Sequence, residues 1–320
     1  MTSSPAAGTG GLTCGIDVGG TKIAGAVVDA EGHVLEEQRV TSPATDAEAV
    51  EDAIARLVGD LGSRHRIEAV GIGAAGYVDS GRRIVMFAPN VAWRDEDLGR
   101  EIHERVGLPV VVENDANAAA WGEFTFGAAT DADDMLMITV GTGVGGGIVI
   151  DGALYRGASG SAAEIGHLRV VPEGLPCGCG NRGCLEQYAS GSALVRDTRA
   201  LAHTPEAAAL LARAGGDPEA IDGPTITAAA AAGDAFARNR VAEAGRWLGE
   251  AIASLTAVLD PGVIVIGGGV SEAGDLLLDP AREAFARELT GRGHRPVPEI
   301  RAASLGNRAG VIGAADLARY

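Results

Sequence analysis

Length, composition and charge set broad limits on this chain. It has 320 residues, of which 46% are hydrophobic and 22% charged, so it can bury large cores and favours two domains over one. Its net charge of −17 disfavours nucleic acids and anionic membranes as main partners. There is no uninterrupted apolar run of about 18 residues, and Met1–Gly11 does not resemble a secretion signal. We therefore expect a cytoplasmic protein.

The first part of the chain alternates strand and helix patterns. β-branched runs separated by Gly-Gly and by the turn at Glu31-Gly32 predict a hairpin within Thr13–Val40. The elements predicted after it are a helix at Asp46–Leu61, a strand at Ile67–Gly73, a helix at Asp95–Val106, a strand at Pro109–Glu113 and a helix at Ala116–Phe124. This order predicts a mixed α/β domain.

The pattern restarts at Met135. Ile16-Asp17-Val18-Gly19 aligns without a gap on Ile138-Thr139-Val140-Gly141, and Gly25 then falls on Gly147. Such an internal repeat predicts a duplicated fold, whose two domains would enclose a cleft. The later segments are a loop-rich insertion at 152–191, alanine-rich helices to Leu259, a strand at Val263–Ile266 and a helix after Asn307. We expect one domain at 1–130, joined by the last helix at about 308–320, and a larger one at 131–307.

Three glycine clusters are candidate phosphate-binding turns. In the first, Gly19 and Gly20 would let backbone N–H groups approach a phosphate, and Thr21 and Lys22 would add donors. Asp17, just before them, would organise Mg²⁺. The alternative for this segment is an ordinary hairpin turn. The other two clusters contain Gly141, Thr142 and Gly143, and Gly268 and Gly269; two of the three would hold nucleotide phosphates and one would flank the base.

Glu113-Asn114-Asp115 lies where a predicted strand ends and a helix begins. Asp115 has two interpretations. It could be the N-cap of that helix, since aspartate is a preferred cap. If the strand end faces a cleft, Asp115 could instead accept a proton from a substrate hydroxyl that attacks a phosphorus atom. Asn114 would then hydrogen-bond the same substrate.

One histidine and three cysteines, His167, Cys177, Cys179 and Cys184, form a set typical of structural zinc. Unrelated thiols or a labile disulfide are the alternative. Four protein ligands leave no open position, so the metal would be structural. It would hold the loop that carries Glu164 and Glu186. With Asn90 and Asp115, these two acids could bind the hydroxyls of a sugar.

Together these residues resemble the ROK family of bacterial sugar kinases and sugar-responsive repressors, most of all its ATP-dependent, zinc-containing glucokinases. The resemblance spans most of the chain. The segments that carry it are Asp17–Lys22, Ala88-Pro89-Asn90 with Trp93, Glu113–Asp115, Gly141–Gly147, Glu164–His167, Cys177–Glu186 and Gly267–Gly269.

The resemblance implies an actin-like, ribonuclease-H-like duplicated fold with an interdomain cleft. It implies transfer of the ATP γ-phosphate to the 6-hydroxyl of glucose, with Mg²⁺ as cofactor and Asp115 as general base. It also implies a homodimer or homotetramer, and zinc on His167 and the three cysteines. The residues implied to contact the hexose are Asn90, Asn114, Asp115, Glu164, His167 and Glu186. His167 would thus use one ring nitrogen for the metal and the other for the sugar.

Two features of this chain vary among members of the family. Ala74-Ala75-Gly76 stands where many relatives carry a proline, which leaves the sugar preference open. Only a short segment precedes the first strand, so we expect no DNA-binding domain. The alternatives are the same chemistry on N-acetylglucosamine, N-acetylmannosamine or fructose, a polyphosphate-dependent glucokinase, and a non-catalytic sugar sensor.

Overall fold

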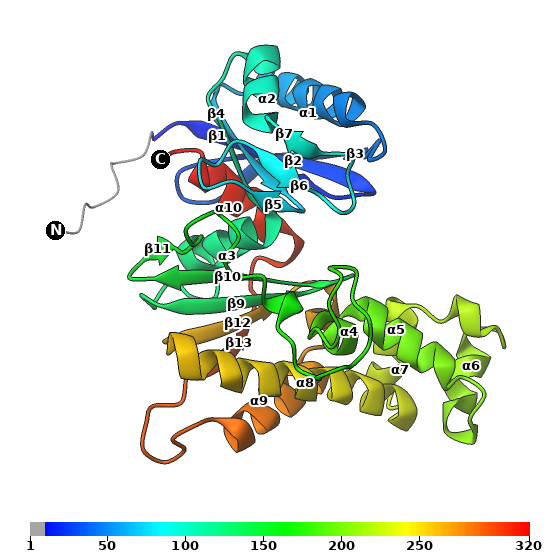
Figure 1. Cartoon of the computed structure of the whole chain (residues 1–320). Coiled ribbons are helices and arrows are strands. Elements are labelled where there is room, and N and C mark those ends of the chain that lie inside the picture. The colour runs from blue at the N-terminus through cyan, green and yellow to red at the C-terminus, as the bar shows by residue number, and fades with distance from the viewer. Residues whose placement is uncertain (1–9) are drawn as a thin grey trace. The chain divides into compact units, whose positions relative to one another are not determined.

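The computed structural model describes residues 10–320, which divide into two compact units (Figure 1). The N-terminal unit contains the described residues to Asp134, Gly147–Ala163 and Ser304–Tyr320, and the C-terminal unit contains Met135–Gly146 and Glu164–Ala303. The domain limits expected from the sequence stay a prediction, because the two units are defined only by which residues pack together. The expectations about Met1–Gly11 fall almost wholly outside the described residues.

The N-terminal unit is built on a five-stranded sheet with the order β3-β2-β1-β4-β8. Its strands are β1 (Leu12–Val18), β2 (Lys22–Val28), β3 (Val34–Thr41), β4 (Ile67–Ala74) and β8 (Val110–Asn114). The first three strands form antiparallel pairs, whereas β1, β4 and β8 are parallel. A small sheet of β5 (Tyr77–Val78), β6 (Val85–Phe87) and β7 (Arg94–Glu96) accompanies it.

Helices cover both faces of this sheet. On one face, α1 (Ala47–Gly62) and α2 (Leu98–Val106) close a core of apolar side chains, while α10 (Ala309–Leu317) and α3 (Asp115–Phe126) lie on the other (Figure 1). Asp46 caps α1, because its Oδ1 accepts the Ala49 N–H at 3.1 Å. The predicted start of α2 at Asp95 is wrong: Arg94–Glu96 pairs as β7, and Asp97 is the cap.

The second sheet repeats the first, with the order β11-β10-β9-β12-β13. Its strands are β9 (Met135–Val140), β10 (Val144–Ile150), β11 (Ala153–Leu154), β12 (Val263–Gly267) and β13 (Glu299–Ala302). As β4 does in the first sheet, β12 pairs in parallel with both neighbours. The predicted duplicated α/β fold is confirmed.

Helices and short turns make up the rest of the C-terminal unit. They are η1 (Ile165–His167), α4 (Glu186–Ala189), α5 (Gly191–Ala200), η2 (Pro205–Ala207), α6 (Ala208–Arg213), η3 (Pro218–Ala220), α7 (Gly223–Ala231), α8 (Ala235–Leu259), η4 (Gly269–Ala273) and α9 (Asp275–Glu288). The long helices α8 and α9 run beside each other (Figure 1). The N-terminal unit also contains η5 (Gly306–Arg308). Among residues 10–320, no helix is both long and apolar enough to cross a membrane.

Helix α10 packs directly against the backbone of β1 and β4. A Cβ atom added to Gly15 would collide with the carbonyl of Val311, and one added to Gly71 would collide with the carbonyl of Ala314. These two strand positions therefore require glycine, because the helix backbone occupies the space of a side chain.

We expect Gly71→Ala to lower the free energy of unfolding by about 1–3 kcal/mol, since overpacking forces the helix backbone to move. Urea denaturation measures this change. Gly59→Ala is the matched control: Gly59 is exposed within α1 with open space around it, so alanine there should stabilise by about 0.4–1 kcal/mol. Equal stability of the Gly71→Ala variant and the parent would contradict this packing.

Candidate active site

Three parallel strands of the N-terminal sheet end together, and the predicted acidic residues lie at or just after the ends of two of them. In the pairing register, Asp17 of β1 lies opposite Gly73 of β4, and Gly73 lies opposite Glu113 of β8. Paired strands are about 4.8 Å apart, so Asp17 and Glu113 are about 10 Å apart along the sheet. A Cβ atom on Gly73 would lie 3.6 Å from the Cα atom of Asp115. Asp17 and Asp115 thus share the carboxyl edge, where α/β sheets bind ligands.

The glycine turn after β1 lies next to Asn90. The Gly19 N–H closes the turn by donating to the Lys22 carbonyl at 3.0 Å. A Cβ atom on Gly20 would lie 3.1 Å from the Asn90 side chain, and Thr21 and Lys22 are exposed. The predicted phosphate-binding turn and one predicted sugar-binding residue are therefore neighbours within this unit.

Asp17 is a largely enclosed carboxyl group near positive charge. Burial raises its pKa above the usual range, and the charge of Lys22 lowers it in part. Gly310 is in the first turn of α10, and a Cβ atom there would be 3.6 Å from Asp17 Cγ. A helix N-terminus favours an ionised carboxylate. An enclosed carboxylate in this setting fits a Mg²⁺ site, because the cation would offset the cost of burial.

The cap of α3 is Asn114, so the N-cap interpretation of Asp115 is wrong. Asn114 Oδ1 accepts the Asn117 N–H at 3.0 Å, and Asn114 Nδ2 donates to the Gly76 carbonyl at 3.0 Å. Asp115 is the first residue of the helix proper, where a carboxylate is favoured by the helix dipole. The side-chain cap of α3 is thus Asn114 rather than Asp115.

The predicted zinc ligands come together in the C-terminal unit. One ligand atom from each of His167, Cys177, Cys179 and Cys184 lies within 4.8 Å of all the others. The Cys177 Sγ–His167 Nδ1 distance is 3.6 Å, and the Cys179 Sγ–Cys184 Sγ distance is 3.7 Å. A tetrahedron with Zn–S bonds of about 2.3 Å has edges of about 3.8 Å. The cysteines are free thiols rather than a disulfide, so the arrangement fits one tetrahedral ion.

The electrostatics of this cluster also fit a metal. Burial raises the pKa of Cys184 to about 12, and the neighbouring Cys179 and Cys177 sulfurs add to the rise. Three close sulfur atoms cannot all ionise without a compensating charge. A bound cation supplies that charge and deprotonates its thiol ligands. Gly183 allows the tight turn before Cys184, since its φ is 78° and a Cβ atom would collide with the Val171 carbonyl.

Glu186 joins the cysteine cluster to the second glycine loop. Its Oε2 accepts the Val144 N–H at 3.1 Å, and its Oε1 lies 4.0 Å from Cys177 Sγ. Glu164 lies on the other side of His167, with its Oε2 3.9 Å from His167 Nε2. Burial raises the pKa of Glu164. The charge of His167 lowers this pKa, and the charge of Glu186 raises it further. Both acids are thus held around the predicted metal site.

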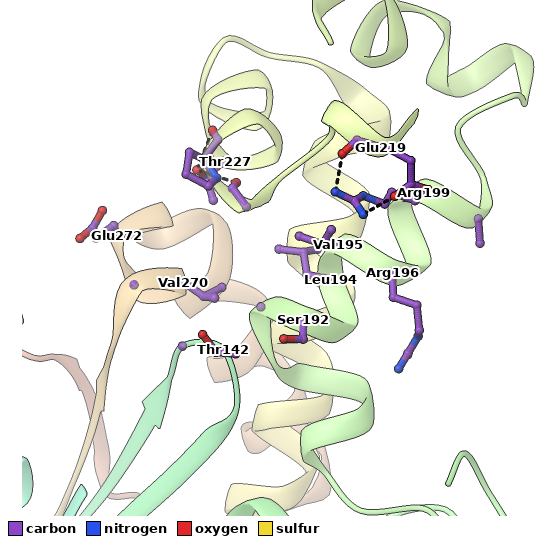
Figure 2. Close-up of a pocket in the computed structure, with 16 residues that line it drawn as sticks. Thr142, Ser192, Leu194, Val195, Arg196, Arg199, Glu219, Thr227, Val270 and Glu272 are labelled. Atoms are coloured by element: carbon purple, nitrogen blue, oxygen red, sulfur yellow. Dashed lines mark hydrogen bonds and ion pairs between the residues drawn. The ribbon is translucent and has the colours of Figure 1, made fainter. Parts of the chain in front are cut away.

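A large cavity opens within the C-terminal unit (Figure 2). Its volume is about 1130 Å³, and its lining includes Gly141, Thr142 and Gly269 from the predicted glycine clusters. The start of α5 contacts the turn at Gly141, because the Gly191 N–H donates to the Gly141 carbonyl at 2.8 Å. Two of the three clusters therefore line one cavity, as expected for a nucleotide.

The remaining lining residues are not among the predicted site residues. Figure 2 shows Ser192 and Val270 near Thr142, and the ion pair of Arg199 and Glu219, 2.7 Å apart, on a further wall. Ser190 caps α5, and a serine before a helical run is a signal that marks this segment. No local pattern marks Arg199 and Glu219, which are 20 positions apart.

The predicted sugar-binding residues fall into two groups. Asn90, Asn114 and Asp115 belong to the N-terminal unit, and Glu164, His167 and Glu186 belong to the C-terminal unit. The predicted nucleotide-binding residues divide likewise: Asp17, Gly19, Gly20, Thr21 and Lys22 are in the first unit, and Gly141, Thr142, Gly143, Gly268 and Gly269 are in the second. Each group is assembled within its own unit.

Comparison with known proteins places the chain in one family. The model of the ROK family matches residues 13–320. The chain is 53% identical to a glucokinase of Streptomyces coelicolor, with 97% of this chain and 98% of the relative covered. It is 54% identical to the ROK family glucokinase of Streptomyces griseus solved with glucose and AMPPNP, with a TM-score of 0.89 and 97% and 99% coverage. The ROK hexokinase of Thermus thermophilus is 37% identical, with a TM-score of 0.80 and 96% and 97% coverage. The chain belongs to the ROK family.

Proposed function

We propose that this chain is an ATP-dependent glucokinase, which transfers the γ-phosphate of ATP to the 6-hydroxyl of glucose. The observation that carries the proposal is the high identity, over nearly the whole chain, to proteins described as glucokinases, one of them solved with glucose and AMPPNP. The acidic edge, the glycine turns and the Cys₃His cluster are all present in this chain.

In the proposed reaction, Asp115 is the general base. Its carboxylate takes the proton of the 6-hydroxyl as that oxygen attacks the γ-phosphorus, while the bond from this phosphorus to the β,γ-bridging oxygen breaks and ADP leaves. This role is supported by the position of Asp115 as the first residue of α3, directly after β8 ends at Asn114. Asn114 keeps a second amide N–H beyond the one donated to Gly76, which suits a sugar hydroxyl.

The nucleotide would be shared among the glycine clusters. The C-terminal cavity is large enough for a nucleotide. The Gly141 N–H closes the turn by donating to the Gly143 carbonyl at 2.9 Å, and the N–H groups of Thr142 and Gly143 would bind phosphate oxygens. In the N-terminal unit, the exposed Lys22 and the turn at Gly19-Gly20 would also bind phosphate. Asp17 would hold Mg²⁺, which when bound neutralises phosphate charge.

The sugar would be bound by Asn90, Asn114, Glu164, His167 and Glu186. His167 supports this assignment, since its Nδ1 faces Cys177 while its Nε2 faces Glu164. The cluster would hold Zn²⁺ as a structural ion that keeps these side chains in place. We also propose that the protein is cytoplasmic and forms a homodimer or homotetramer.

A panel of acceptors and donors tests the substrate. We expect the highest kcat/KM for glucose with ATP, with N-acetylglucosamine, N-acetylmannosamine and fructose as poorer acceptors and polyphosphate as a poorer donor. A coupled assay of ADP formation, and a direct assay of sugar phosphate for polyphosphate, measure these rates. Turnover of an N-acetylhexosamine without turnover of glucose would overturn the assignment, and binding without any turnover would favour a sugar sensor.

Asp115→Asn should lower kcat by about 10²–10⁴-fold, because the amide cannot accept the proton. Glucose binding, measured by calorimetry, should be largely kept. The control is Asp52→Asn on α1, an exposed carboxyl group that pairs with Arg56 and Arg105. Substantial turnover by Asp115→Asn would rule out its role as general base.

The zinc prediction concerns the metal content of the purified protein as well as its stability. We expect about one zinc per chain by elemental analysis, and Cys184→Ser should lose it and lower Tm by roughly 5 °C or more, equivalent to about 2 kcal/mol. Cys14→Ala is the matched control, because Cys14 is a buried thiol of β1 outside the cluster and its variant should keep the zinc. A purified protein without zinc and indifferent to chelators would show that the cluster is not a metal site.

A further inference from the structure

Glu113 is a buried carboxyl group directly beside the proposed catalytic segment. Its exposed fraction is 2%, and its Oε2 lies 3.5 Å from Arg82 Nε and 3.5 Å from Arg156 Nη1. Its Oε1 accepts the Asn114 N–H at 3.1 Å and the Asn117 side-chain N–H at 3.1 Å. One oxygen therefore faces the two arginines, while the other holds the first turn of α3.

Arg82 is presented by a loop with a fixed shape. Asp79 accepts the N–H groups of Gly81, Arg83 and Ile84, at 3.1, 2.9 and 2.7 Å. Within this loop Arg82 has a φ of 57°, a left-handed conformation unusual for a residue with a side chain. The Arg82 carbonyl accepts the Val112 N–H of β8 at 2.9 Å. The loop thus ties both the backbone and the guanidinium of Arg82 to β8.

Arg156 reaches Glu113 from a distant part of the sequence. It follows β11, in the segment Gly147–Ala163 that packs with the N-terminal unit. The same segment packs tightly against the Asp79 loop, because a Cβ atom on Gly160 would collide with the Val78 carbonyl. Three segments of one unit therefore converge on a single carboxylate.

The charge of this cluster argues for a role beyond stability. Two guanidinium groups face one carboxylate, and although burial lowers the pKa of Arg82 to about 10, that guanidinium stays charged near neutral pH. Buried ionic clusters contribute little net stability compared with apolar packing, but they hold their partners in one geometry. The partners held here are the Asn114 backbone and the first turn of α3, which carries Asp115.

We propose that Glu113, clamped by Arg82 and Arg156, is a positioning residue that holds the Asp115 carboxylate in line for proton transfer. This inference rests on the proposed sugar kinase function. A base displaced by about 1 Å loses about 10²-fold in rate, so a small shift of the first turn of α3 is enough to matter.

The test compares Glu113→Gln with the parent in glucose phosphorylation. Glutamine keeps an acceptor oxygen but removes the charge that the arginines hold. We expect kcat to fall about 10- to 100-fold, with the KM values for glucose and ATP within about threefold of the parent. Glu51→Gln is the matched control: Glu51 is 4% exposed, pairs with Arg105 at 2.9 Å and lies on α1, so its variant should keep the parental kcat.

Arg156→Lys provides a second variant if Glu113→Gln does not fold. Lysine keeps the positive charge but lacks the planar guanidinium group of arginine. We therefore expect kcat to fall again while the KM values stay close to those of the parent. An unchanged kcat in the folded variant, or a change in KM alone, would overturn the inference. A parent protein that phosphorylates no sugar would instead reject the proposed function, which keeps the two failures distinct.

Discussion

The parallel pairing of β1, β4 and β8 is the constraint on which the acidic edge of the N-terminal unit depends. Parallel strands end at the same edge, so Asp17 and the Glu113–Asp115 segment are brought together although far apart in sequence. Two helices begin at this edge, α3 with Asp115 and α10 beside Asp17. A slip of one residue in the register of any strand would send its side chains to the opposite face.

In the C-terminal unit, one carboxylate connects the cysteine cluster to the second glycine loop. Glu186 accepts a backbone N–H of the second glycine loop and lies beside Cys177, so the cysteine cluster and the glycine loop are not independent. Through this side chain, the ion proposed for the cluster would influence the geometry of the turn that lines the large cavity. A metal with no open coordination position can thus affect ligand binding by holding a neighbouring loop.

Local patterns predicted most elements and the complete Cys₃His set, because cap residues, apolar periods and clustered ligands are short-range signals. They did not separate the roles of Asn114 and Asp115, since both are good caps and the choice depends on where the strand ends. They singled out the segment that contains Glu113 but missed its pairing with Arg156, which depends on the path of the chain after β11. Contacts between distant segments leave no periodic trace in a single sequence.

The packing of α10 has a consequence for biosynthesis. Its side chains Val311, Ile312 and Ala315 cover the inner face formed by Ala24, Ala26 and Val28. Nearby, the Arg319 guanidinium donates to the Val28 carbonyl across 291 positions of sequence. On the ribosome, the strands of the first sheet emerge long before the helix that covers one of their faces, and contacts of such long range form slowly. During this interval the nascent chain exposes an apolar sheet face, the kind of surface that promotes aggregation until the last helix covers it.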